Sequence, residues 1–171
     1  MRPFSKISHA LWQSERYHNL PSDEGRYLYI YLLTSSHQTS AGAYRLPDGY
    51  ACEDLRWSLD KYILARDQLV AADFIHFDDE TSVVMITRWF KHNPPMNDSH
   101  LKSIEGELSR LPSESIAEAA YAELVATQEA IEAEKQAKAA RKRKPLSIAS
   151  NGLGGAIPDR LATAFLNRGR Q

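Results

Sequence analysis

The histidines and the cysteine are the side chains best suited to bind a metal or carry out catalysis, so their spacing comes first. His9, His18, His37, His76, His92 and His100 form no HxxxH or HExxH pattern, and Cys52 is the single cysteine. A zinc site needs three or four such ligands brought together. No Ser-His-Asp or paired-carboxylate pattern stands out, and the glycines at 152–155 lack the Lys-Ser/Thr of a phosphate-binding loop. We therefore predict that the protein is not an enzyme and holds no metal and no cofactor.

The most concentrated charge in the sequence is a run of basic residues near the C-terminus. We call it the cationic block, and it consists of Arg141, Lys142, Arg143 and Lys144. At the end of a helix it would also favour the negative pole of the helix dipole. A run of this length exceeds what capping needs, so we expect non-specific attraction to phosphates. The net charge of −1 gives no separate argument for DNA binding.

The elements that position these charges begin with three predicted helices. Ser22 opens a buried helix over 22–37, Tyr44–Leu46 suits a single strand, and 48–55 suits a short helix. A tight connection over 56–58 leads to a helix over 59–72, which Ser58 can cap. Two β-rich runs, 74–77 and 82–86, flank the polar turn 78–81 and predict a hairpin. The spacing therefore predicts a mainly α fold with a small β-hairpin: a winged helix-turn-helix from Ser8 to Pro95, followed by a helical C-terminal extension.

We divide the chain into four predicted segments. Residues 1–96 form the winged-helix domain, and 97–144 form a helical extension with a long Ala/Glu-rich helix and a basic end. Residues 145–157 read as a flexible linker, and 158–171 as a short amphipathic terminal helix. No apolar run is long enough to span a membrane, and residues 1–9 lack the layout of a signal peptide. We expect a cytoplasmic protein with no membrane partner.

A series of short motifs in fixed order carries a family resemblance. They are Lys6-Ile-Ser8 with Trp12, Tyr29-Ile-Tyr-Leu-Leu33 followed by Thr34-Ser-Ser-His37, Tyr44-Arg-Leu-Pro47, Asp54-Leu55 with Trp57, Phe77-Asp-Asp79, and Trp89-Phe-Lys-His-Asn-Pro-Pro95. Over Lys6 to Leu111 the chain resembles the N-terminal domain of phage and prophage replication proteins, winged-helix proteins related to the DnaD-type replisome organisers. The resemblance implies binding at a replication origin and recruitment of a replication protein such as a helicase or its loader.

The resemblance also directs attention to two turn positions. Many such sequences have glycine before the first strand of the wing and after the Asp-Leu pair, where this chain has Asp73 and Arg56. Glycine adopts a positive φ without steric cost, whereas other residues do not.

The candidate contacts to double-stranded DNA combine the cationic block with polar and basic residues of the predicted domain. These are Arg45, Arg56, Ser58, Lys61, Arg66, Arg88 and Lys91. The helix over 59–72 buries Tyr62, Ala65, Leu69 and Ala72 by its spacing, so its outward face offers one lysine against two acids. The wing tip, 78–80, consists of three acids, which a negative minor groove would repel. We therefore predict that the domain recognises DNA sequence only weakly.

Two alternatives stay open from the sequence. In the first, Ile63, Leu64 and Val70 make a dimer or partner surface, so the fold serves protein interaction without sequence-specific DNA binding. Independently of this choice, the terminal helix either docks on its own domain or lays Leu161, Phe165 and Leu166 into a partner's groove, and the leading prediction recruits its partner through this C-terminal region. In the second, the same fold acts as a transcriptional regulator. The leading prediction is a DNA-binding protein of phage-type replication initiation that recruits a replication partner.

Overall fold

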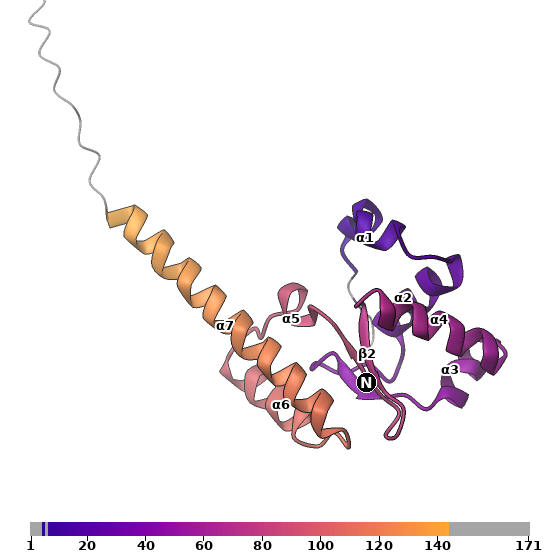
Figure 1. The fold of residues 1–171 in the computed structure, drawn as a ribbon. Coiled ribbons are helices and arrows are strands. Elements are labelled where there is room, and N and C mark those ends of the chain that lie inside the picture. The colour runs from indigo at the N-terminus through magenta and orange to yellow at the C-terminus, as the bar shows by residue number, and fades with distance from the viewer. Residues whose placement is uncertain (1–4, 6, 144–171) are drawn as a thin grey trace, which may run out of the picture. The chain divides into compact units, whose positions relative to one another are not determined.

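The computed structural model describes residue 5 and residues 7–143, and they form a mainly helical protein with a small antiparallel sheet (Figure 1). The predicted linker and terminal helix, with Lys144, Leu161, Phe165 and Leu166, lie outside the described residues. The elements in chain order are η1 (His9–Gln13), α1 (Glu15–His18), α2 (Asp23–Thr34), β1 (Ala43–Arg45), α3 (Asp48–Leu55), α4 (Leu59–Ala71), β2 (Ile75–Asp78), β3 (Val83–Ile86), α5 (Trp89–His92), α6 (Asp98–Leu108) and α7 (Glu114–Arg143).

Side-chain caps fix where the main helices begin. The Ser22 hydroxyl accepts a hydrogen bond from the Gly25 N–H at the start of α2, and Ser58 accepts one from Lys61 at the start of α4. Asn97 does the same for α6. Each cap satisfies a backbone donor that the first helical turn leaves without a partner. The predicted starts at Ser22 and Ser58 are therefore confirmed.

Several tight connections use left-handed backbone. Arg56 has a φ of 56° and Asp73 a φ of 58°. These are the two positions where the resembling sequences have glycine. In this chain the backbone adopts a positive φ at both positions, although a side chain makes that conformation sterically unfavourable. Gly42, with a φ of 68°, is under a second constraint, because a Cβ at this position would overlap the Trp89 indole.

The sheet has the order β1-β3-β2, and both pairings are antiparallel. The predicted hairpin is therefore present as β2 and β3, one residue later than expected on its first strand. The single strand predicted over 44–46 is present as β1, and it pairs with β3, with Tyr44 opposite Val84. All four residues of β3 are buried. This central position explains why β3 is continuously apolar, since strands covered on both faces do not alternate.

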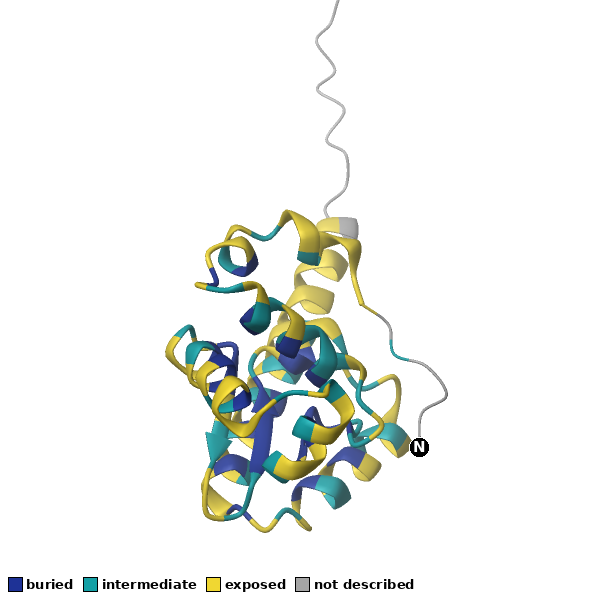
Figure 2. Cartoon of the chain, turned by 90° about the vertical axis from the view of Figure 1, so that its right-hand side faces the viewer, coloured by how far each residue is buried: buried dark blue, intermediate teal, exposed yellow. Residues whose placement is uncertain are grey.

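The core lies where the helices meet the sheet, and Figure 2 shows the buried residues gathered in the interior. Leu28 and Leu32 come from α2, and Tyr62, Ala65 and Leu69 come from α4. The predicted buried stripe of the latter helix is thus confirmed at three positions, while Ala72 is half-buried. Trp89 and Phe90 are also buried, in the short helix α5.

The same core continues into α6 and the first half of α7. Ile104 and Leu108 of α6 are buried together with Ile116, Ala120 and Leu124 of α7. The Glu123 carboxylate accepts hydrogen bonds from the backbone N–H groups of Arg88, at 2.8 Å, and Phe90, at 3.0 Å. The sequence left open whether the long helix packs on the core, and its first half does. This core belongs to the first of two compact units, which ends at Gln136.

The short elements η1 and α1 were not predicted. Within them Tyr17 is buried and contacts the Trp12 ring edge-on, with ring centroids 5.8 Å apart. None of the helices in the described part of the chain combines the length and apolar character needed to cross a membrane.

Candidate nucleic-acid and partner interface

Helix α4 is the element on which the predicted contacts concentrate. A connection of three residues, 56–58, joins it to α3, and its buried side faces the core. Its outward side carries Leu59, Asp60, Lys61, Leu64, Asp67, Val70 and Ala71, all exposed.

Lys61 is engaged within the protein. Its Nζ lies 3.3 Å from Glu24 Oε1 and 4.6 Å from the centroid of the Trp57 ring. A backbone hydrogen bond and, next, the Lys61 ammonium lower the pKa of the Glu24 carboxyl. Both side chains are partly exposed, so the ion pair contributes little to stability. The Glu24 carboxylate nevertheless offsets the positive charge that Lys61 would present to a phosphate.

Arg66 departs most from its expected role. The sequence placed it at the border of the core as a phosphate contact, but its side chain is only 9% exposed. Its guanidinium pairs with Asp48, Asp67 and Asp79 and lies 4.2 Å from the centroid of the Phe77 ring. A buried guanidinium needs such partners, and here they come from α3, from α4 itself and from the β2–β3 turn. As placed, Arg66 joins these elements and is not available to a phosphate.

Two of the three acids around the β2–β3 turn, Asp78 and Asp79, have partners within the protein. Asp79 pairs with Arg66 at 3.0 Å. The Asp78 carboxylate accepts hydrogen bonds from the Glu80 N–H and the Thr81 hydroxyl. Hydrogen bonds, first from the Ser113 hydroxyl and then from Thr81, lower the pKa of Asp78. From the sequence we predicted only that these acids would repel DNA. Their ion pair and hydrogen bonds within the protein could not be predicted.

Two of the three residues predicted to form a partner surface on α4 are exposed apolar side chains. Leu64 is 64% exposed and Val70 is 42% exposed, whereas Ile63 is half-buried. Leu64 also lines a shallow groove of about 390 Å³ between α4 and the start of α2. Glu24, Asp60 and Lys61 border this groove, so its rim is charged and its floor is partly apolar.

The remaining candidate contacts do not form one patch. Arg45 lies opposite Val83, at the end of the sheet next to the β2–β3 turn, whereas Arg88 follows the other end of β3. From Val83 to Ile86 the strand spans about 10 Å, and Arg88 lies two residues beyond it. Arg56 pairs with Glu53, and the Ser58 hydroxyl is used as the cap of α4. Lys91 is exposed on α5.

The cationic block is described only in part. Arg141 is exposed near the end of α7. Lys142 and Arg143 belong to that helix, but their side chains are outside the description, as is the whole of Lys144.

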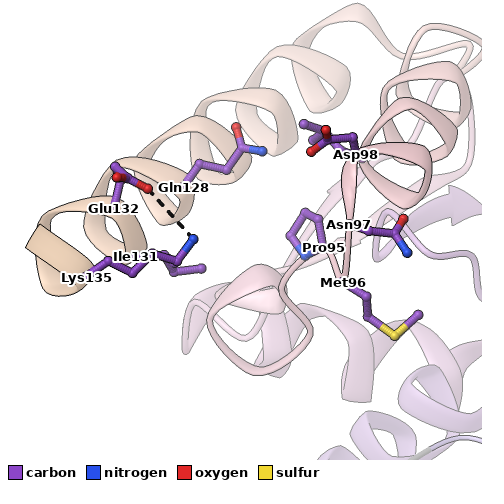
Figure 3. A pocket seen from close by; sticks show the side chains of 9 residues that line it. Pro95, Met96, Asn97, Asp98, Gln128, Ile131, Glu132 and Lys135 are labelled. Carbon is purple, nitrogen blue, oxygen red and sulfur yellow. Dashed lines mark ion pairs between the residues drawn. The ribbon is translucent and has the colours of Figure 1, made fainter.

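A hollow of about 360 Å³ between α6 and α7 offers no converging chemistry (Figure 3). Pro95, Met96 and Asp98 lie on one wall. On the other, Glu132 and Lys135 pair with each other along α7 at 3.7 Å. Within the described residues, moreover, no group of three or more His, Cys, Asp or Glu side chains is placed to hold a metal ion.

Comparison of the chain with protein-family models, with curated proteins and with solved structures finds no match.

Proposed function

We propose that this chain is a non-enzymatic winged-helix protein of the phage replication type, which associates with duplex DNA mainly by phosphate attraction and brings a protein partner to it. The observation that carries this proposal is the order α2, β1, α3, α4, β2, β3 with an antiparallel sheet ordered β1-β3-β2. A winged helix has this order, with α4 as the recognition helix and β2–β3 as the wing. The resemblance over Lys6 to Leu111 covers the same elements.

The charges support association without reading of bases. Base readout requires donors on α4 that are free to reach the major groove, but Lys61 and Arg66 are paired with carboxylates. The cationic block is then the main source of counterion release. Phosphate contacts of this kind give affinity and carry no sequence information.

The exposed apolar residues of α4 support a role in docking a protein. Leu64 and Val70 are open to solvent on the face that a DNA reader would fill with polar groups. In a protein of the phage replication type, the partner would be a helicase or its loader.

The test is a titration of a labelled duplex with the full chain over a salt series. The matched variants replace all four residues of the cationic block with alanine, or carry Lys61→Ala, with Lys102→Ala on α6 as the control. Without the block we expect the slope of log affinity against log salt to fall by about 0.9 for each lost phosphate contact. Lys61→Ala and the control should stay within about twofold of the wild type. No binding by the wild type at about 50 mM salt would refute the proposal.

A second candidate is a protein-interaction module that does not use DNA. The observation that favours it is the exposure of Leu64 beside a lysine already held by Glu24. If α4 joins two copies of the chain, Leu64→Asp should convert a dimer into a monomer in sedimentation. An unchanged oligomeric state would count against this candidate.

A further inference from the structure

A separate hollow, away from α4, lies between the N-terminal segment and α5. It has a volume of about 340 Å³, which is within the range of pockets that take small ligands or single side chains. Its apolar lining includes residues from η1, α2, the connection between α4 and β2, and α5: Leu11, Tyr29, Leu33, Phe74 and Trp89. The motifs that carried the resemblance touch this region, but the DNA proposal makes no use of it.

Basic side chains line the same hollow. They are Arg16, Arg88, Lys91 and His92. Arg16 is committed to the fold, because it pairs with Asp73 at 3.3 Å and its guanidinium lies 4.3 Å from the centroid of the Phe74 ring. Arg88 and Lys91 are exposed, and neither forms an ion pair within residues 7–143. Two cations whose side chains have no ion-pair partner among the described residues therefore stand beside an apolar cavity, with the Glu123 carboxylate on the backbone of Arg88.

Tyr29 adds a hydrogen-bond donor to this group. Its ring packs edge-on against Phe74, with centroids 4.8 Å apart. Burial raises the pKa of the Tyr29 phenol, whereas the nearby Arg16 and Arg88 guanidinium groups oppose that rise. Tyr29 is one of the lining residues, so a phenol stands among the basic side chains of the hollow.

The acids nearby are already engaged. Asp73 accepts from Arg16, and the Glu123 carboxylate is held by the N–H groups of Arg88 and Phe90. The hollow thus presents positive charge and apolar surface together. A ligand that complements it carries an apolar group flanked by anions.

We propose that this hollow binds an acidic peptide segment of a partner protein, with one apolar side chain inside the cavity and adjacent carboxylates on Arg88 and Lys91. The site is distinct from α4 and from the cationic block. Arg88 and Lys91, which the sequence predicted as DNA contacts, would here bind a protein ligand. Single-stranded nucleic acid is disfavoured, because it needs open aromatic faces for stacking. Here Trp89 is 5% exposed and Phe74 is 4% exposed beneath Arg16.

The test uses fluorescence anisotropy of an aspartate-rich peptide with one central phenylalanine, titrated with the full chain at low salt. Replacing that phenylalanine by alanine should weaken binding about tenfold or more, because the cavity then stays empty. Arg88→Ala with Lys91→Ala should weaken it by at least as much. Ala10→Phe, at an exposed position that lines the hollow, should block the peptide.

Lys102→Ala, an exposed cation on α6, is the matched control and should bind as the wild type does. Circular dichroism of each variant verifies that it is folded. Equal affinity of the double variant and the control, or no loss with the alanine peptide, would overturn the proposal. The proposal would also be overturned if an oligothymidine strand displaced the peptide from the wild type and the double variant did not bind that strand. Failure here would leave the duplex titration unaffected, because that proposal depends on the cationic block.

Discussion

Arg56 is a non-glycine residue in left-handed backbone, at the turn between α3 and α4. A Cβ in this conformation destabilises the folded state by about 1–2 kcal/mol. Glycine removes this cost but offsets part of the gain, because it gives the unfolded chain more conformational entropy. We expect Arg56→Gly to raise the free energy of unfolding by roughly 1 kcal/mol relative to Arg56→Ala. Both variants lose the exposed pair with Glu53, so the comparison isolates the backbone. Equal midpoints in urea would mean that the turn carries no such cost.

Arg66 should be a determinant of stability. Arg66→Ala removes a buried guanidinium that pairs with Asp48 and Asp79 and covers Phe77, so we expect a loss of about 2–3 kcal/mol. Asp67→Ala is the control, because Asp67 is an exposed partner of the same group and should cost less than about 1 kcal/mol. Thermal unfolding of both variants measures this difference. Similar losses from the two changes would contradict the role given to Arg66.

These residues also mark what sequence reasoning could and could not reach. Helical spacing was enough to predict burial of Tyr62 and Leu69, because period alone decides which face of a helix is apolar. It could not predict the burial of Arg66, because Asp48 and Asp79 come from distant parts of the chain. The left-handed turns were foreseeable only through the glycines of the resembling sequences.

At the scale of elements, Glu123 fixes α7 to the start of α5. Its carboxylate oxygens each accept a backbone hydrogen bond, from Arg88 and from Phe90. Glu123→Gln keeps one acceptor oxygen, so one N–H loses its partner and we expect a loss of about 1–3 kcal/mol. Hydrogen exchange should speed up at the amides of Arg88 and Phe90. Glu118→Gln, at an exposed position of α7, is the control, and equal exchange in the two variants would contradict this link.

The elements with strong local signals were predicted well. Serine caps and helical periodicity located α2, α3 and α4, because both signals act within a few residues. The pairing of β1 with β3 was missed, since it joins residues about 40 positions apart and leaves no local pattern. The short η1 and α1 have too few turns to show a period.

At the scale of the whole molecule, the first half of α7 completes the core. Ile116, Ala120 and Leu124 are between 0% and 4% exposed, and burying the two large side chains contributes about 1.5–3 kcal/mol each. A chain that ends at Leu111 should therefore lose most of the marginal stability of a domain. A chain that ends at Gln136 keeps all three residues and should unfold within about 1 kcal/mol of the full chain. If the chain that ends at Leu111 unfolded cooperatively at the same midpoint as the full chain, this account of α7 would be refuted.

The distribution of charge over the described residues supports a DNA-associated protein that does not read sequence. The cations of α4 face carboxylates, Arg88 and Lys91 line the hollow beside α5, and the others are scattered or belong to the end of α7. Specific recognition of duplex DNA usually exceeds non-specific binding by about 10³-fold or more.

The most direct test of this claim is selection of bound sequences from a random pool of duplexes, followed by titration of the selected and the starting pools. We predict that the selected pool binds less than about tenfold more tightly than the starting pool, because phosphate attraction is blind to sequence. A selected motif bound about 10³-fold more tightly, with that preference lost in Lys61→Ala, would contradict the account.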